Sequence, residues 1–247
     1  TAGQYHNYNL SGMMNFRKNK FNIYGSGSFR YDNILSTRER TYSYVYPNFV
    51  LPTISQKINR EENPILGSLE LGCNYFITPK KTISLTTIST VYQENTIESI
   101  YTTGPADYDI NSKEYFVGLT TDIRGSYKQK FDNPKNILNT DLYYSLRINN
   151  SNANYGNGND NAHSGLGPES DKMKLDNHLS FSIDYNYPIN KQIILGSGIK
   201  TIVKRFYSEL NYLHNPYSFY YHEDLYAGYI SLDYSISDFL KIKLGNR

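Results

Sequence analysis

The stretch His178-Leu179-Ser180-Phe181-Ser182-Ile183-Asp184-Tyr185-Asn186-Tyr187 alternates strictly between polar and apolar side chains. Successive side chains of a β-strand point to opposite faces, so one face of this strand is apolar and the other is polar. The same alternation recurs along the chain, for example over Leu69–Ile77 and Val117–Tyr127. Mid-strand charges fall on the polar parity, and the exception, Arg205, lies at the loop end of its strand. The sequence therefore predicts an all-β protein with an apolar face that is almost free of charge.

Composition excludes several classes of protein. The 247 residues include 25 Lys and Arg against 23 Asp and Glu, and a net charge of +2 gives no basic footprint for nucleic acid. The single cysteine, Cys73, rules out a disulfide framework and a cysteine-rich zinc site, and we interpret it as a small apolar side chain. No run approaches ~18 consecutive apolar residues, so no transmembrane helix is predicted. The 26 Tyr, beside abundant Asn, Ser, Thr and Ile, favour β-structure with wet edges.

Short turns and long polar segments alternate along the chain. Five turn-like breaks rich in Pro, Asn, Asp and Lys lie at 17–20, 78–81, 132–136, 189–192 and 237–238. Four long polar segments are predicted as loops, at roughly 35–64, 96–113, 150–177 and 208–223. The pattern predicts ten strands, near 5–17, 20–34, 65–78, 82–95, 115–131, 137–149, 178–188, 192–207, 224–236 and 239–246.

Alternation alone fits both a membrane barrel with a wet interior and a soluble antiparallel sheet with one face on a core. Three features favour the barrel. The polar face carries Ser, Asn, Asp and Arg over many strands, and short turns alternate systematically with long loops. Aromatic residues also gather near strand ends, where Tyr suits a membrane interface. We therefore predict an antiparallel transmembrane β-barrel, and a soluble β-sandwich that binds carbohydrate remains the alternative.

Several segments resemble a known family. The segments Tyr8–Ser26, Tyr75–Leu85 and Glu223–Tyr234 resemble barrel strands of TonB-dependent receptor-like proteins of the Bacteroidota. More narrowly, they are similar to the outer-membrane β-barrel family of those proteins. The final Leu244–Arg247 resembles a Gly-Leu-Arg-x-Glu stretch of the family, with Asn in place of Leu and without the Glu.

The resemblance implies more than the chain contains. Relatives have a signal peptide, an N-terminal plug that contacts TonB and a barrel of about twenty-two strands. No plug is visible, so we expect residues 1–247 to be an outer-membrane β-barrel segment, an internal part of a larger barrel. A closed ten-stranded barrel is the alternative, because even strand numbers from eight upward are known.

The resemblance also implies a role at the cell outer membrane. It implies a receptor and transporter that binds and imports an unknown external ligand. Its partners are outer-membrane lipid, a TonB-type motor acting through a plug absent from this chain and a surface lipoprotein. No cofactor and no enzymatic activity are expected.

Candidate ligand-binding residues come from parity and from Tyr-rich segments, not from a functional motif. Charged side chains on the polar parity are expected to line the barrel interior: Arg30, Glu70, Asp122, Arg124, Asp141, Arg147 and Asp184. Exposed Tyr beside Asn and Ser makes an adaptable binding surface. The Tyr candidates are Tyr42, Tyr44, Tyr46, Tyr217, Tyr220 and Tyr221.

Candidates for catalysis are few. His222, Glu223 and Asp224 are adjacent, and neighbours on a strand point to opposite faces, so a solvated strand end is the simpler interpretation. A ten-stranded outer-membrane hydrolase is the enzymatic alternative. It requires His222 to meet a carboxylate such as Asp160 or Asp171 across one cleft.

Two further patterns carry little functional weight. The oxygens of Asn157–Asp160 lack calcium-loop spacing, and His163 in the same loop is expected to be exposed, so no metal site is predicted. The Gly-x-Gly pairs at Gly25–Gly27 and Gly196–Gly198 lie inside strands with no helix to hold a phosphate. These glycines are predicted to relieve crowding by a neighbouring side chain or backbone.

Overall fold

The chain forms a single large antiparallel sheet and a small hairpin. The computed structural model describes residues 7–43, 45–46, 49–50, 53–104, 107–157, 169–212, 215–236 and 240–246. The strands are β1 (Asn7–Lys18), β2 (Phe21–Asp32), β3 (Ile34–Tyr42), β4 (Val45–Tyr46), β5 (Phe49–Val50), β6 (Ile54–Thr78), β7 (Lys81–Thr103), β8 (Tyr108–Lys130), β9 (Ile137–Asn157), β10 (Glu169–Pro188), β11 (Ile193–Tyr212), β12 (Asn215–Ser235) and β13 (Lys241–Asn246). Eleven strands make the sheet, and β4 pairs with β5 alone. The predicted all-β antiparallel class is confirmed.

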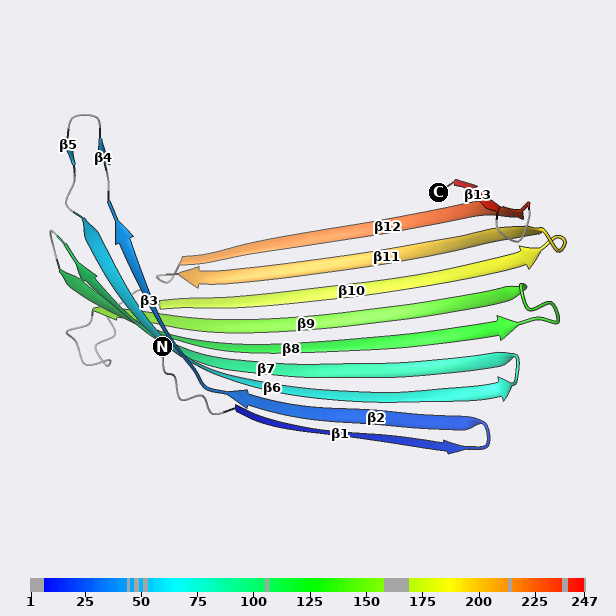
Figure 1. Ribbon diagram of the computed structural model, residues 1–247, viewed down its shortest axis with the longest axis horizontal. Coiled ribbons are helices and arrows are strands. Elements are labelled where there is room, and N and C mark those ends of the chain that lie inside the picture. The colour runs from blue at the N-terminus through cyan, green and yellow to red at the C-terminus, as the bar shows by residue number, and fades with distance from the viewer. Residues whose placement is uncertain are drawn as a thin grey trace.

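The strand order follows the chain from one edge of the sheet to the other. It runs β1-β2-β6-β7-β8-β9-β10-β11-β12-β13, and β3 continues β2 along the outer part of β6. Figure 1 shows a curved, open sheet with β1 and β13 at opposite edges. The short turns lie together at one end, and β3 leads to the β4–β5 hairpin at the other.

The strands are much longer than the alternation predicts. Turns form as predicted at 19–20 and 79–80, but the ladder continues through most of the predicted loops. β7 and β8 remain paired to Thr102 and Tyr108, across the segment 96–113 that was expected to be a loop. Polar residues occupy both faces there, so the alternation ends although the backbone pairing does not. The loop prediction was wrong for most of 35–64, 96–113 and 208–223, and for residues 150–157 and 169–177 of the segment 150–177, which belong to β9 and β10.

The two faces of the sheet differ in both chemistry and crowding. Among the described residues, the buried side chains all lie on the polar parity: Asp32, Thr96, Thr102, Ser145, Ala153 and Ser231. Side chains converge on the concave side of a curved sheet, so this face, called the polar face below, is concave. On the opposite, apolar face, no described side chain is buried, and Leu69, Leu71, Leu142 and Ile199 are exposed.

No second layer covers the apolar face in the described residues. Among the described residues, the one buried hydrophobic side chain is Ala153, and it lies on the polar face, so the described part of the chain has no hydrophobic core. The soluble β-sandwich is therefore wrong, because its two sheets must pack face to face. None of the described residues forms a helix long and apolar enough to cross a bilayer.

Aromatic residues mark the two ends of the apolar band on the apolar face. Tyr75, Tyr127 and Tyr185 lie near the short turns, and Tyr31 and Tyr226 lie further out. Aliphatic side chains fill the space between, as in the ~25 Å apolar band of outer-membrane barrels. Tyr92 and Tyr143, which the sequence also places near strand ends, lie on the polar face by register, so their rings do not face lipid.

Tyrosines laid over glycines stabilise the polar face. Tyr229 crosses Gly198 and donates a hydrogen bond to Asp184 Oδ1 at 2.6 Å. Tyr24 crosses Gly72 in the same way, and its hydroxyl lies 2.8 Å from Thr86 Oγ1. A methyl group at either glycine would collide with the ring. The predicted relief of crowding by a neighbouring side chain is thus confirmed at Gly198.

Lysines connect successive short turns. Lys20 Nζ donates to the Ile77 carbonyl at 3.0 Å, and Lys135 Nζ donates to the Lys191 carbonyl at 2.9 Å. Between them, Lys80 Nζ pairs with Asp132 Oδ1 at 2.6 Å. This hydrogen bond and the charge of Lys80 lower the pKa of Asp132. Each lysine reaches the turn of the next hairpin along the chain, so the turns form a connected rim.

The first prediction tests which face meets lipid. Leu142 and Asp141 are adjacent, exposed and on opposite faces of β9. Leu142→Arg in the full-length protein should destabilise the vesicle-folded state by about 2–4 kcal/mol, because the charge faces hydrocarbon. Asp141→Arg, facing water, should cost much less. Urea titration in lipid vesicles measures both, and equal losses would contradict the assignment of faces.

The second prediction tests the tyrosine-over-glycine contact. Gly198→Ala should destabilise the full-length protein by about 1–3 kcal/mol, because the methyl group displaces Tyr229 from Asp184. Gly12→Ala is the matched control, since nothing lies within 4 Å of its added Cβ. It should change the free energy of unfolding by less than about 0.5 kcal/mol. The same titration compares the two variants, and a Gly198→Ala variant as stable as wild type would refute the contact.

Candidate functional site

A row of polar side chains crosses five strands on the polar face. In register, Asp122 of β8 lies opposite Ser145 of β9, which lies opposite His178 of β10. The row continues through Lys204 of β11 to Glu223 of β12. Directly opposed residues of an antiparallel pair share a face and lie close together, so these five form one continuous surface, called the polar row below.

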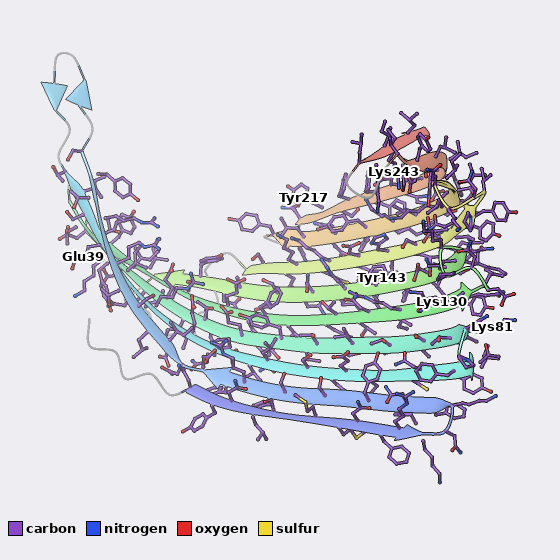
Figure 2. The ribbon with its side chains drawn as sticks, turned by 45° about the vertical axis from the view of Figure 1, so that its right-hand side comes forward. Glu39, Lys81, Lys130, Tyr143, Tyr217 and Lys243 are labelled. Atoms are coloured by element: carbon purple, nitrogen blue, oxygen red, sulfur yellow. The ribbon has the colours of Figure 1, made fainter. Side chains whose placement is uncertain are left out.

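Tyr143 joins the β8 part of the row to its neighbours. Its hydroxyl donates to Asp122 Oδ1 at 2.9 Å. The guanidinium carbon of Arg124 lies 5.5 Å from the Tyr143 ring centroid, within the range of a cation–π contact. His178 packs edge-on against the same ring at 5.4 Å. Figure 2 shows Tyr143 near the middle of the sheet, between Lys130 at the turn end and Tyr217 at the opposite end.

The β11–β12 part of the row is an ion pair with a tyrosine attached. Lys204 Nζ lies 3.2 Å from Glu223 Oε2, which also accepts a hydrogen bond from the Tyr221 hydroxyl at 3.1 Å. Between the two halves, His178 Nε2 is buried and has no hydrogen-bond partner among the described residues. The row and its neighbours therefore offer a ligand charges of both signs, aromatic faces and the ring nitrogen Nε2 of His178, which has no hydrogen-bond partner among the described residues.

The predicted charged residues all lie on the polar face, at several heights. Asp122 and Arg124 meet at Tyr143, and Asp184 is held by Tyr229. Asp141 and Arg147 are exposed on β9. Register thus brings Asp122 and Arg124 together, but Asp184 and Arg147 lie on either side of the row.

The remaining two charged candidates lie far across the sheet. Arg30 pairs with Asp32 on β2 at 2.6 Å. Glu70 on β6 is 3.4 Å from the Ser26 hydroxyl. The structure does not bring Arg30 or Glu70 to the polar row. Their roles stay predictions for a different part of the wall.

The Tyr candidates divide between the faces. Tyr217 and Tyr221 lie on the polar face of β12, whereas Tyr220 is opposite Tyr207 on the apolar face. These residues belong to a strand and not to the predicted loop. Tyr42 is exposed at the end of β3. Tyr44 lies outside the described residues, and for Tyr46 only its place in β4 is described.

A basic recess above the row was missed by sequence reasoning. Lys172 and Lys174 line a hollow of about 170 Å³ on the polar face with Asn149 and Phe116. Glu114 also lines this hollow, and it accepts a hydrogen bond from Ser151 at 3.0 Å. The sequence alone shows that both lysines share the polar parity of β10. Their position beside β9 follows only from the register of the two strands.

The geometry that the hydrolase alternative requires is not formed by the described residues. His222 Nε2 lies 2.9 Å from Asp224 Oδ1 on the apolar face, whereas Glu223 points to the polar face. Asp171 contacts Asn152 instead of His222, and Asp160 lies outside the described residues. Within the described ranges, no group of three or more His, Cys, Asp or Glu side chains could hold a metal ion. Of the residues weighed for calcium, Asn157 is the last residue of β9, whereas Asn159 and Asp160 lie outside the described residues, as does His163.

Comparisons with known proteins agree with this architecture. Residues 129–247 match the family model described as the outer membrane protein beta-barrel family. The ferric yersiniabactin uptake receptor FyuA from Yersinia pestis is similar in structure, with a TM-score of 0.53 and 14% identity over 98% of this chain. The ferripyoverdine receptor of the outer membrane of Pseudomonas aeruginosa has a TM-score of 0.53 and 8% identity over 97% of this chain. No curated protein sequence matches the chain.

These similarities define the class of fold and the location. The sheet is an antiparallel β-barrel wall of the kind found in TonB-dependent receptors, and the protein is located in the outer membrane. The chain spans less than half of each receptor, 44% and 40% of their lengths.

Proposed function

We propose that residues 1–247 form about half of the wall of a TonB-dependent receptor-like barrel, of the Bacteroidota type, that binds and imports an external ligand. The open edges at β1 and β13 support a larger barrel, since a barrel must close to leave no unpaired edge in lipid. The lengths of the structurally similar receptors agree with this proposal.

The observation that carries the proposal is the polar row on the concave face. Asp122, Arg124, Tyr143 and His178 form one connected group facing the interior, and Lys204 continues it. A wall that only spanned the membrane would need no such arrangement of charge and aromatic rings. In this scheme the row and the Lys172/Lys174 recess contact the ligand, while Tyr217 and Tyr221 meet it first at the outer end.

The chemistry of the wall favours a ligand with anionic groups. Lys172 and Lys174 are adjacent on one face, and the nearest acid of their recess, Glu114, is already bonded to Ser151. Arg124 is held over a ring and pairs with no carboxylate among the described residues. Energy for import would come from an inner-membrane motor acting on a plug inside the barrel.

Uptake experiments test this function. A strain lacking the gene is complemented with wild type, with Arg124→Gln or with Arg205→Gln. Labelled ferric yersiniabactin, ferripyoverdine and maltoheptaose serve as probes. We expect uptake of a probe to require the gene, to stop when a protonophore removes the motor's energy, and to fall about tenfold in Arg124→Gln, which loses a charge-assisted contact.

Arg205→Gln is the matched control, because Arg205 lies on the opposite face of the wall. It should leave uptake unchanged. A deletion strain that takes up all three probes at the wild-type rate contradicts the import function. Equal losses in both arginine variants contradict the assignment of ligand contact to the polar face.

A further inference from the structure

A polar group interrupts the apolar face at its outer boundary. Arg205 of β11 lies between Asn177 of β10 and His222 of β12 in register, and all three face away from the polar row. Tyr226 marks this boundary on β12. It lies on the same face as His222 and is four residues closer to the turns. A charge on this face needs a reason, since facing hydrocarbon at mid-depth costs about 2–4 kcal/mol.

Arg205 forms no ion pair in the described part of the chain. It is exposed, and no ion pair or hydrogen bond of the described residues involves its guanidinium. The nearest carboxylate on this face, Asp224, is taken by His222 at 2.9 Å. Beside Arg205, the Tyr144 hydroxyl donates to Asn177 Oδ1 at 3.1 Å, which leaves the amide Nδ2 of Asn177 as a second donor. A guanidinium and an amide donor therefore face outward together.

The surroundings place this group at the headgroup level of the bilayer. Further out on the same face, Asn152, Asp171, Glu209 and Asn211 line a polar hollow that belongs in water. Towards the turns, β11 presents the uncharged side chains of Val203, Thr201 and Ile199 on this face. Arg205 thus stands where hydrocarbon gives way to headgroups, and arginine binds phosphate with paired hydrogen bonds.

An apolar hollow lies below Arg205 on the same strands. It has a volume of about 610 Å³, and its floor is low because Gly228 and Ser197 lack large side chains. Ile183, Ile199 and Ile230 form its walls. Ile199 is six residues from Arg205 along β11, about 20 Å at the rise of a strand. With the usual strand tilt, the hollow is near the middle of a ~30 Å hydrocarbon core.

We propose that β10, β11 and β12 form a binding site for one anionic, phosphate-bearing membrane lipid on the outside of the barrel. Its phosphate binds Arg205 and Asn177, and an acyl chain lies in the hollow at Gly228. The outward direction of Arg205, its unmatched charge and the continuity of the hollow with the apolar band identify a lipid as the occupant. The site is separate from the polar row and does not depend on ligand import.

Lipid binding to the full-length protein in a non-ionic detergent tests the proposal. Native mass spectrometry measures retention of dioleoylphosphatidylglycerol and of dioleoylphosphatidylcholine, which has the same chains but no net charge. Wild type should retain the anionic lipid more strongly. Arg205→Gln should weaken its binding about fivefold, the effect of one basic residue at a membrane surface.

A second variant and a control separate the two parts of the site. Gly228→Leu fills the hollow, and its added Cβ meets only the Gly198 carbonyl at 3.8 Å, so the strand tolerates it. It should weaken binding of the long-chain lipid but not of dihexanoylphosphatidylglycerol. Arg147→Gln removes an exposed arginine from the opposite face and should leave lipid binding unchanged.

Several results would overturn the proposal. Equal retention of the two dioleoyl lipids by wild type, or unchanged binding in Arg205→Gln, removes the phosphate contact. Unchanged binding in Gly228→Leu removes the acyl site. Inorganic phosphate that displaces the anionic lipid at equal concentration would show a simple anion site and no lipid site. Heat-modifiable migration in gels verifies that each variant is folded.

Discussion

An apolar sheet face without a partner in its own chain is the constraint on which the rest of the structure depends. Leu69, Leu142 and Ile199 are exposed on a face that no second layer covers in the described residues. In water this surface would aggregate, but in a bilayer it is satisfied by lipid, while the ladder pairs the backbone. The membrane therefore replaces the hydrophobic core. Because the concave side does not have to form a hydrophobic core, it can carry charges, hydroxyls and aromatic rings.

On the concave side, order comes from contacts between strands rather than from burial. Tyr229 over Gly198 and Tyr24 over Gly72 each span neighbouring strands and end in a hydrogen bond. Tyr143 does the same between Asp122 and His178. A large ring laid across the sheet both fills space and fixes the position of a polar partner. The wall can thus present charges at defined positions with little side-chain packing around them.

The sequence predicts the faces well and the site poorly. Alternation over residues 178–187 assigns each side chain to a face, and Pro, Asn and Lys mark the turns, because both signals are local. Which residues meet across strands depends on the register, so the link between Tyr143 and Asp122 could not be read. The outer halves of the strands were missed because polar residues there occupy both faces. Arg205 stood out as the exception to parity, but its neighbours Asn177 and His222 emerge only when three strands are aligned.

The lysines of the short turns have a mechanical consequence. Lys20, Lys80 and Lys135 each cross to the following hairpin, so adjacent hairpins are joined at their tips as well as along their edges. A load applied to one hairpin at this end would pass sideways into its neighbours. In a barrel whose interior is pulled from the turn side, such a rim spreads the force over several strands and protects any single strand pair from being peeled away.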